Sequence, residues 1–235
     1  MQSIFYPASE RGHANFGWLD SHHSFSFGQW YDPKKIHFGA LRVLNDDIVQ
    51  GAGGFGMHPH DNMEIVSIPL KGALKHKDST GTDGVIATGD VQIMSAGTGI
   101  RHSEFNASNT DAVNFLQVWV IPKERNIKPR YDQKAFDNKD RVNQWQVVVS
   151  PDRNDNGLWI NQDARFALTK LEEGKSISYE PKFKGNGVYL FVIEGVITID
   201  GKKVAKRDAI GLFDTTGFTI QADKDAEILA IEVPM

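Results

Sequence analysis

The chain has 235 residues, with 26 Lys and Arg against 30 Asp and Glu, which gives a formal net charge of −4. Its hydrophobic fraction of 40% and charged fraction of 24% are ordinary for a globular protein, so a sizeable core is possible. The charge balance gives no basic footprint for nucleic acid. Cysteine is absent, which excludes disulfides and thiolate metal sites, so any metal must be held by imidazole and carboxylate groups.

Targeting signals are not visible in the sequence. The first residues, MQSIFYPASERGHANF, contain no apolar core of a secretory signal. No apolar run approaches the ~18 residues that a membrane span needs. We therefore expect a cytoplasmic protein without membrane contact.

Short runs rich in β-branched and aromatic residues recur along the chain, separated by clusters of Gly, Asn and Asp. Clear examples are 64–70, 113–121, 145–149, 188–193 and 227–233. Strands at this spacing, in a chain with 22 glycines, predict an all-β fold of sandwich or barrel type. The Asp200-Gly201 pair between two such runs predicts a two-residue hairpin.

The segment 122–144 differs from its flanks because charged residues are dense in it. We interpret it as an exposed connector. A long loop within one domain is the less favoured alternative, since structureless loops above ~15 residues are uncommon inside compact domains. The chain then divides into an N-terminal metal-binding domain at 1–121, a charged linker at 122–144 and a C-terminal domain without metal ligands at 145–235.

The two halves share a layout of turns. The corresponding positions are Gly72 and Gly195, Asp90 and Asp208, and Gly99 and Gly217. Each half contains a strand, a tight hairpin, a buried strand and a Gly turn in the same order. The sequence therefore predicts one β-unit used twice, as two domains in tandem.

Two short motifs place metal-binding side chains on one face of a strand. His58 and His60 are separated by one residue, and so are His102 and Glu104. Because alternate residues of an extended strand point to the same face, each pair can present two ligands together. If the two strands lie side by side, three neutral imidazoles and a carboxylate converge on an interior site suited to Fe(II), Mn, Co, Ni, Cu or Zn.

The repeat supplies a check on this ligand set. The corresponding offsets in the second half hold Pro181, Phe183, Ile220 and Ala222, all of them apolar. We therefore predict a dry interior without metal in the second half. Burying four titratable groups in the first half without a partner would be costly, and a metal ion is the simplest partner.

Glu64 is a rival carboxylate, with the same parity as His58 and His60. Both Glu64 and Glu104 can face the site under this pattern. Spacing alone does not decide which is the ligand and which acts beside the metal as an acid or base.

These motifs resemble those of the pirin-like branch of the cupin family. The resemblance is carried by GFGMHPHDNMEIVSIPLKGALKHKDS and TGDVQIMSAGTGIRHSEFN, and it extends to WLDSHHSFSFGQWYDP and FGALRVLNDD. It covers most of residues 1–121, whereas the second half agrees in length and layout more than in motif. The resemblance implies a bicupin, with two jelly-roll-like β-barrels in tandem and one N-terminal metal site.

Taken position by position, the resemblance implies that the metal ligands are His58, His60, His102 and Glu104. It also implies that Glu64 is not a direct ligand and that the second barrel holds no metal. Members of the family are linked to quercetin 2,3-dioxygenase activity. Other members act as iron-bound co-regulators through protein contacts.

We therefore predict a metal-dependent dioxygenase that cleaves a flavonol such as quercetin with O2 and releases CO. The alternative is a non-catalytic, iron-sensing regulator that acts through a protein partner. The expected cofactor is one divalent transition metal, with Fe(II) in first place and Cu, Ni, Co, Mn or Zn as alternatives. Either Glu104 or Glu64 is expected to take the hydroxyl proton of the substrate as a general base.

Large apolar side chains are candidates for the wall of an aromatic pocket near the metal. They are Phe25, Phe27, Phe55, Met57 and Phe105. Plain core packing is the competing interpretation, since such side chains are usually buried anyway. Of the other histidines, His76 lies in the polar run KHKDS and is predicted at the surface. A solvated or hydrogen-bonded role is predicted for His22 and His23.

Overall fold

The computed structural model describes residues 1–235, and nearly all of its regular structure is β-strand. The strands up to residue 135 are β1 (Gln2–Tyr6), β2 (Gly12–Asn15), β3 (Leu19–His23), β4 (Leu41–Val49), β5 (Gly54–His60), β6 (Glu64–Lys71), β7 (Ala73–Asp78), β8 (Asp83–Ala87), β9 (Asp90–Ser95), β10 (Ile100–Asn106), β11 (Val113–Val120) and β12 (Arg130–Ala135). The later strands are β13 (Gln146–Ser150), β14 (Leu158–Trp159), β15 (Arg165–Leu171), β16 (Ser176–Tyr179), β17 (Asn186–Ile199), β18 (Lys202–Ala205), β19 (Ala209–Phe213) and β20 (Phe218–Pro234). Two 3-10 turns complete the structure, η1 (Ala8–Glu10) and η2 (Asn138–Arg141). The predicted all-β class is confirmed.

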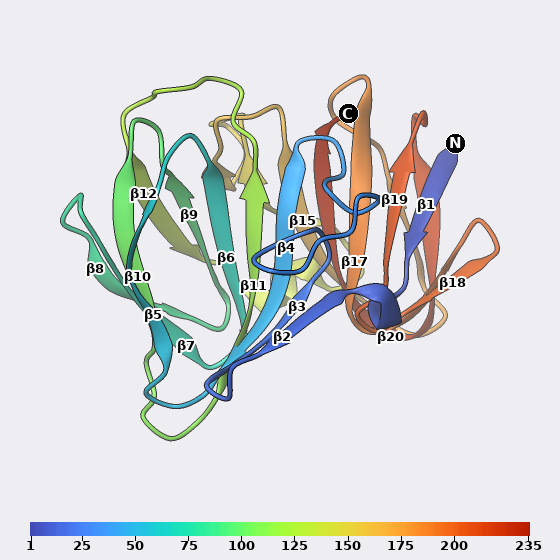
Figure 1. The fold of residues 1–235 in the computed structure, drawn as a ribbon. Helices are drawn as coiled ribbons and strands as arrows, with labels where there is room; N and C mark the ends of the chain where they lie inside the picture. Colours follow the sequence, from blue (N-terminus) through green and yellow to red (C-terminus); the bar gives the residue numbers. More distant parts are fainter.

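Two sheets make up the first half (Figure 1). One has seven strands in the order β12-β9-β6-β11-β4-β3-β2, and the other has four in the order β5-β10-β7-β8. No strand is shared between the two sheets, and β5 and β8 each have a single partner strand. The unit is therefore an open β-sandwich, and the closed barrel that we predicted is wrong in this respect.

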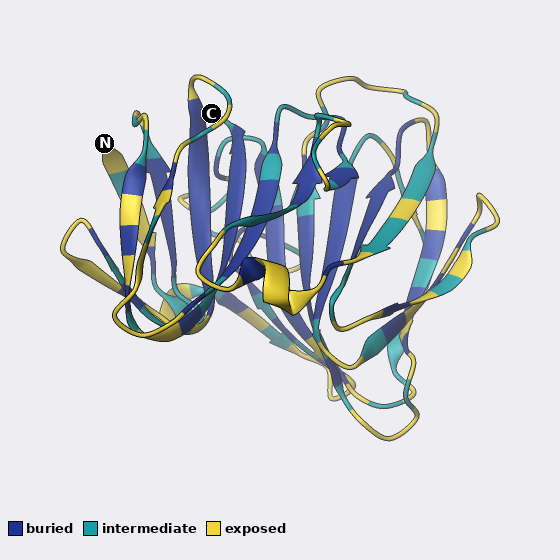
Figure 2. Cartoon of the chain, turned by 180° about the vertical axis from the view of Figure 1, so that it is seen from behind, coloured by how far each residue is buried: buried dark blue, intermediate teal, exposed yellow.

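The central strands of the seven-stranded sheet are buried on both faces, as Figure 2 shows. On β6 and β11, Val66, Ile68, Leu116 and Val118 point into a core shared with the second half. The alternate residue Gln117 lines a pocket on the opposite face. The period of two along a strand thus gives the sheet one apolar face and one functional face.

The second half is a sheet folded over two long strands, β17 and β20, which have 14 and 17 residues. Their mutual register shifts between Val192 and Ile197, as β-bulges do where a strand bends. On either side of the shift β17 pairs with β19 and β18, and β20 pairs with β15 and β16. The folded sheet encloses a largely apolar core that includes Ile197, Ile220 and Ala222.

The positions predicted to replace the ligands in the second half divide into two pairs. Ile220 and Ala222 lie inside the apolar core, at 0% and 1% exposure. Pro181 and Phe183 precede β17 and are only partly buried. The Asp200-Gly201 hairpin is confirmed: it joins β17 to β18, with φ of 49° and 72°, values that suit this two-residue turn.

Chain segments cross between the two halves. Strand β1 pairs with β19 of the second half. Strand β12 lies inside the segment predicted as a charged linker, yet it pairs with β9 and extends the seven-stranded sheet. The boundaries at 121 and 145 stay a prediction. No helix in the structure is long and apolar enough to span a bilayer.

Four aromatic rings meet in the core between the halves. The ring centroid of Tyr189 lies 5.2 Å from that of Tyr6, 5.5 Å from that of Phe25 and 5.7 Å from that of Phe38. Tyr189 belongs to β17, whereas the other three come from the first 40 residues. The cluster therefore couples the packing of one half to that of the other.

Replacing Phe38 by Ala should lower the free energy of unfolding by about 3–5 kcal/mol, because it leaves a cavity in a close-packed core. We expect the protein to unfold in a single transition, because the aromatic cluster packs the two halves against each other. Urea denaturation followed by circular dichroism and tryptophan fluorescence measures both quantities. Tyr31→Ala, at a residue 71% exposed, is the control and should change stability by less than about 0.5 kcal/mol. An equally small effect of Phe38→Ala would contradict the role given to the cluster.

Candidate metal centre

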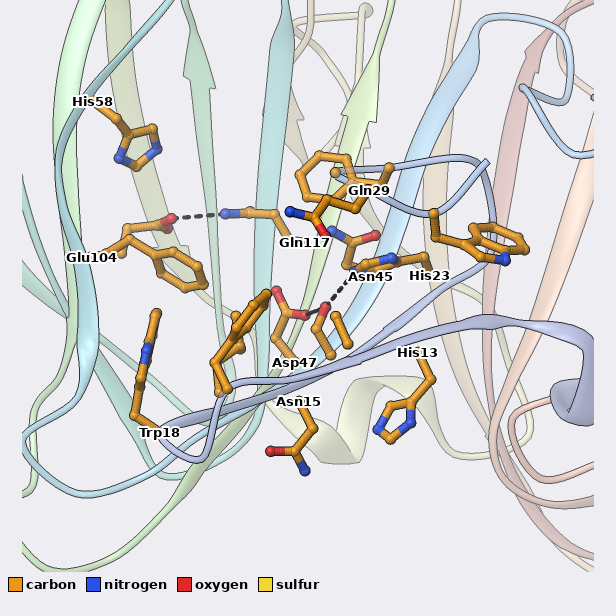
Figure 3. Close-up of a pocket in the computed structure, with 18 of the residues that line it drawn as sticks. His13, Asn15, Trp18, His23, Gln29, Asn45, Asp47, His58, Glu104 and Gln117 are labelled. Carbon is orange, nitrogen blue, oxygen red and sulfur yellow. Dashed lines mark hydrogen bonds between the residues drawn. The ribbon is translucent and has the colours of Figure 1, made fainter. Parts of the chain in front are cut away.

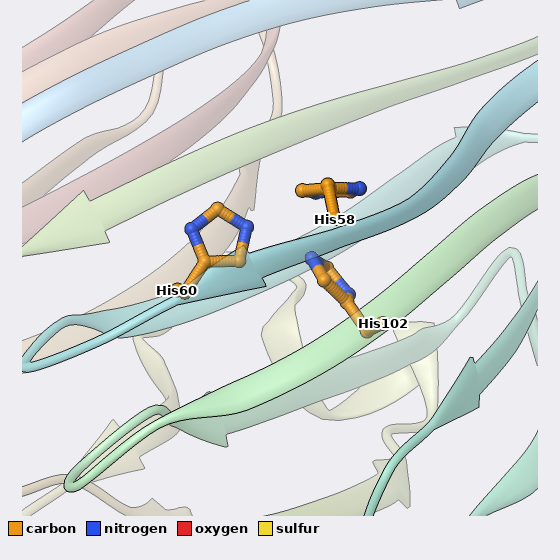
Figure 4. A group of neighbouring side chains, drawn as sticks. All are labelled: His58, His60 and His102. Atoms are coloured by element: carbon orange, nitrogen blue, oxygen red, sulfur yellow. The ribbon is translucent and has the colours of Figure 1, made fainter.

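The antiparallel pairing of β5 with β10 brings three histidines together. His58 lies directly opposite His102, and His60 lies opposite Ile100. The ring centroids are 4.4 Å apart for His58 and His102, 4.8 Å for His58 and His60, and 4.9 Å for His60 and His102. Figure 4 shows the three imidazoles, on two neighbouring strands, facing a common point. One nitrogen from each ring lies within 4.8 Å of the others, a spacing that one metal ion can bridge.

Glu104 follows His102 on the same face of β10, and both side chains are buried. Its carboxylate accepts hydrogen bonds from Gln117 Nε2 at 2.8 Å and from Ser67 Oγ at 3.2 Å. Burial raises the pKa of Glu104 to about 7, and the hydrogen bonds from Ser67 and Gln117 partly oppose that rise. Gln117 and Ser67 thus fix the carboxylate beside the histidines.

A fourth histidine, His76, also belongs to this neighbourhood. It is fully buried on β7, and its Nε2 lies 2.9 Å from Asp78 Oδ2. Its ring centroid is 5.4 Å from that of His102, and its ligand atom groups with those of His102 and Glu104. The prediction of a surface position for His76 is wrong. The alternation of Leu74, His76 and Asp78 with lysines was the signal that places it inward.

The donor atoms fit a metal ion. Both ring nitrogens of His102 are buried and have no hydrogen-bond partner in the protein. Burial, together with the neighbouring imidazoles, lowers the pKa of His102 to about 2. Burial and then His58 lower that of His60 to about 4, so both rings are neutral and offer a lone pair. His58 Nδ1 lies 2.8 Å from the carbonyl of Gly56, an orienting contact typical of ligating histidines.

A pocket of about 800 Å³ opens beside these residues, and Figure 3 shows its lining. His58, His60 and Glu104 contribute to one side of it. The inner face of the seven-stranded sheet contributes Asn45, Asp47, Gln117 and Trp119, and the segment 13–30 contributes most of the rest. His58, His60 and Glu104 therefore face a space large enough for a small aromatic molecule.

The predicted aromatic wall is partly present. Phe27 and Phe55 line the pocket. Phe25 lies instead in the core between the halves, and Met57 and Phe105 are exposed at 46% and 41% on the outer face of their strands. The aromatic side chains that the sequence analysis missed are Phe16, Trp18, Trp30 and Trp119. The alternation along 113–120 was the available signal for Trp119, whose ring centroid lies 4.9 Å from that of His60.

The structure does not bring Glu64 to the histidines. Its carboxylate accepts hydrogen bonds from Ser95 Oγ at 2.8 Å and from the backbone N–H of Asn161 at 3.1 Å, and it does not line the pocket. Glu64 is the first residue of β6 and contacts Asn161 of the second half. The prediction that Glu64 faces the site beside the histidines is therefore wrong. Burial raises its pKa to about 7, while Asn161, Ser95 and Arg130 act in the opposite direction.

Comparison with known proteins places the chain in a family. Residues 6–120 match the pirin family model, and residues 147–233 match the model of a quercetinase C-terminal cupin domain. The chain is 45% identical over 231 residues to the quercetin 2,3-dioxygenase of Escherichia coli strain K12, which covers 97% of this chain and 96% of that protein. This chain belongs to the pirin family.

Solved structures agree with that assignment. This pirin matches the crystal structure of YhhW from Escherichia coli with a TM-score of 0.94 at 42% identity, covering 99% of this chain and 98% of that one. It matches the structure of the bacterial pirin YhhW in complex with nickel(II), also from Escherichia coli, with a TM-score of 0.93 at 41% identity, covering 99% of both chains. The predicted family and the tandem cupin fold are confirmed.

The raised pKa of Glu64 predicts a pH-dependent stability of the metal-free pirin. A carboxyl whose pKa is about 7 when folded and 4.5 when unfolded stabilises the fold fully below pH 4.5. That contribution disappears as the pH rises through 7. Wild type should therefore lose roughly 3 kcal/mol over this window relative to Glu64→Gln, as measured by urea denaturation at each pH. Glu173→Gln, at an exposed position, controls for the loss of a charge. A constant difference between wild type and Glu64→Gln would contradict the prediction.

Proposed function

We propose that this pirin is a metal-dependent dioxygenase that cleaves a flavonol such as quercetin, using O2 and releasing CO. The observation that carries the proposal is the cluster of His58, His60 and His102, which lies beside an aromatic-lined pocket that His58, His60 and Glu104 help to form. The name of the Escherichia coli relative, quercetin 2,3-dioxygenase, supports the substrate and the reaction.

We infer that the four ligands hold one divalent transition metal. The structure of the Escherichia coli pirin in complex with nickel(II) supports metal binding by this pirin. Neutral imidazoles with one carboxylate suit Fe(II), Ni, Co, Mn, Cu and Zn alike. The choice of Fe(II) therefore stays a prediction, as does the cytoplasmic location.

A bound divalent metal would supply Lewis acidity and an open position for a substrate oxygen. Glu104 lines the pocket, so its carboxylate is placed to accept the proton of a substrate hydroxyl. Gln117 and Ser67 hold that carboxylate in place. Trp119 and Phe27 meet edge to face at a centroid distance of 5.4 Å and offer apolar surface to an aromatic ring.

Glu64 is a poor candidate for the base, because its carboxylate points away from the pocket and is held by Ser95 and Asn161. A pocket of about 800 Å³ beside the histidines favours a reaction on a small molecule over the regulatory alternative. The protein partner of that alternative stays a prediction.

Replacing His60 by Ala should reduce metal content and lower kcat/KM for quercetin more than about a hundredfold, because one of the ligands is lost. Elemental analysis of the purified protein gives the metal content, and aerobic turnover with CO measured in stoichiometry gives the activity. His37→Ala is the matched control, since His37 is exposed and lies outside the pocket. Equal rates in wild type and His60→Ala would remove the histidines from the chemistry.

Gln117→Leu should weaken metal binding about 10–100-fold while preserving the fold, because Glu104 loses the donor that orients it. Titration of metal-free protein with Ni(II) measures the dissociation constant directly. Gln133→Leu, on the edge strand β12, is the control and should bind Ni(II) as wild type does. An unchanged Ni(II) affinity in Gln117→Leu would mean that Glu104 is not held in place for a metal.

A further inference from the structure

A row of polar side chains crosses the inner face of the seven-stranded sheet. In the strand register, Ser67 on β6 lies directly opposite Gln117 on β11. Gln117 in turn lies opposite Asn45 on β4, and Asn45 lies opposite His23 on β3. Strands lie about 4.8 Å apart, so His23 lies two strands, or roughly 10 Å, from Gln117. Ser67 and Gln117, at one end of this row, contact Glu104, whereas His23, at the other end, lies away from His58, as Figure 3 shows.

A second pair lies one step further along the same two strands. Ser21 on β3 is directly opposite Asp47 on β4, and Ser21 Oγ donates a hydrogen bond to Asp47 Oδ1. His23 Nε2 lies 2.8 Å from the same hydroxyl. Asp47, Ser21 and His23 therefore form a continuous hydrogen-bonded chain, and with Asn45 all four residues line the pocket.

This group leaves two buried atoms without a partner in the protein, His23 Nδ1 and Asn45 Oδ1. Their residues are only 4% and 3% exposed, and leaving buried polar atoms unpaired is costly. Because Ser21 donates to Asp47, its oxygen accepts from Nε2–H of His23. That arrangement leaves Nδ1 as a bare acceptor. Burial, followed by the electrostatic influence of His22 and Arg11, lowers the pKa of His23 to about 4, in agreement with a neutral ring.

We propose that Ser21, His23, Asn45 and Asp47 form a second polar subsite, which binds hydroxyl groups of an aromatic ligand at the end of the pocket remote from the histidine cluster. The inference rests on the proposed function, because it assigns the far end of the substrate in the same pocket. Two open acceptors require a ligand with two donors. The subsite therefore takes ring hydroxyls and disfavours anions and methyl ethers.

The surroundings of the subsite suit a planar ring. The ring centroid of Phe27 lies 5.3 Å from that of His23, and that of Trp30 lies 6.5 Å from it. Both side chains line the pocket, as does Trp119 next to His60. An aromatic ligand that spans the pocket would meet apolar rings along its length and hydrogen-bonding groups at both ends.

Equilibrium binding without oxygen tests the proposal separately from turnover. The probes are quercetin and 3-hydroxyflavone, which lacks the hydroxyls of the outer rings, and quenching of tryptophan fluorescence reports the Kd in metal-free and Ni(II)-loaded protein. Wild type should bind quercetin at least tenfold more tightly than 3-hydroxyflavone. His23→Phe and Asn45→Leu should each reduce that preference about tenfold, as expected when a ligand loses a hydrogen bond to a buried acceptor.

His22→Phe is the matched control, because His22 is the neighbour of His23 on β3, points to the other face and does not line the pocket. It should keep the wild-type preference. Equal affinity of wild type for the two probes, or a preference unchanged in both variants, would overturn the subsite. A preserved preference without any turnover of quercetin would instead refute the proposed dioxygenase and leave the subsite in place. The comparison of probes in wild type needs no variant, so it holds even if a substitution prevents folding.

Discussion

The register between β5 and β10 is the constraint on which the site depends. It sets His58 opposite His102 and turns His102 and Glu104 to the same side of their strand. A slip of one residue would turn every side chain of a strand to the other face of the sheet. The histidines and Glu104 would then no longer face one another. The register is irregular between His102 and Glu104, where a bulge locally re-aims the chain.

The two faces of the seven-stranded sheet have different roles, because successive side chains along each strand point to opposite faces. One face supplies Val66 and Val118 to the core between the halves, and the other supplies Ser67 and Gln117 to the pocket. Glu104 belongs to the opposite sheet, so its hydrogen bonds to Ser67 and Gln117 tie the two layers together at the metal centre. Packing on one face of the sheet thereby keeps Ser67 and Gln117 in position to contact Glu104 on the other.

Much of the site could be predicted because strand parity is a local property. His58 and His60 needed only the rule that alternate residues share a face. Glu64 has the same parity in the sequence, but a turn separates β5 from β6, and the two strands belong to different sheets. Parity therefore does not predict that Glu64 faces the same site as His58 and His60. His76 was misplaced because its run is polar; the alternation of Leu74, His76 and Asp78 with lysines favoured an inward position, and the pairing of β7 with β10 shows it. Contacts between distant segments decide such cases, and one sequence does not contain them.

The second half has a physical role even though its core is largely apolar. The outer face of the seven-stranded sheet is lined by residues such as Val66, Ile68 and Leu116, which alone would form a large apolar surface. Such surfaces in isolated domains favour association or aggregation, so they must be covered. The second half covers this face with residues such as Tyr189 and Phe191, while its own interior is filled mostly by apolar side chains. The second half therefore supports the sheet whose other face lines the pocket.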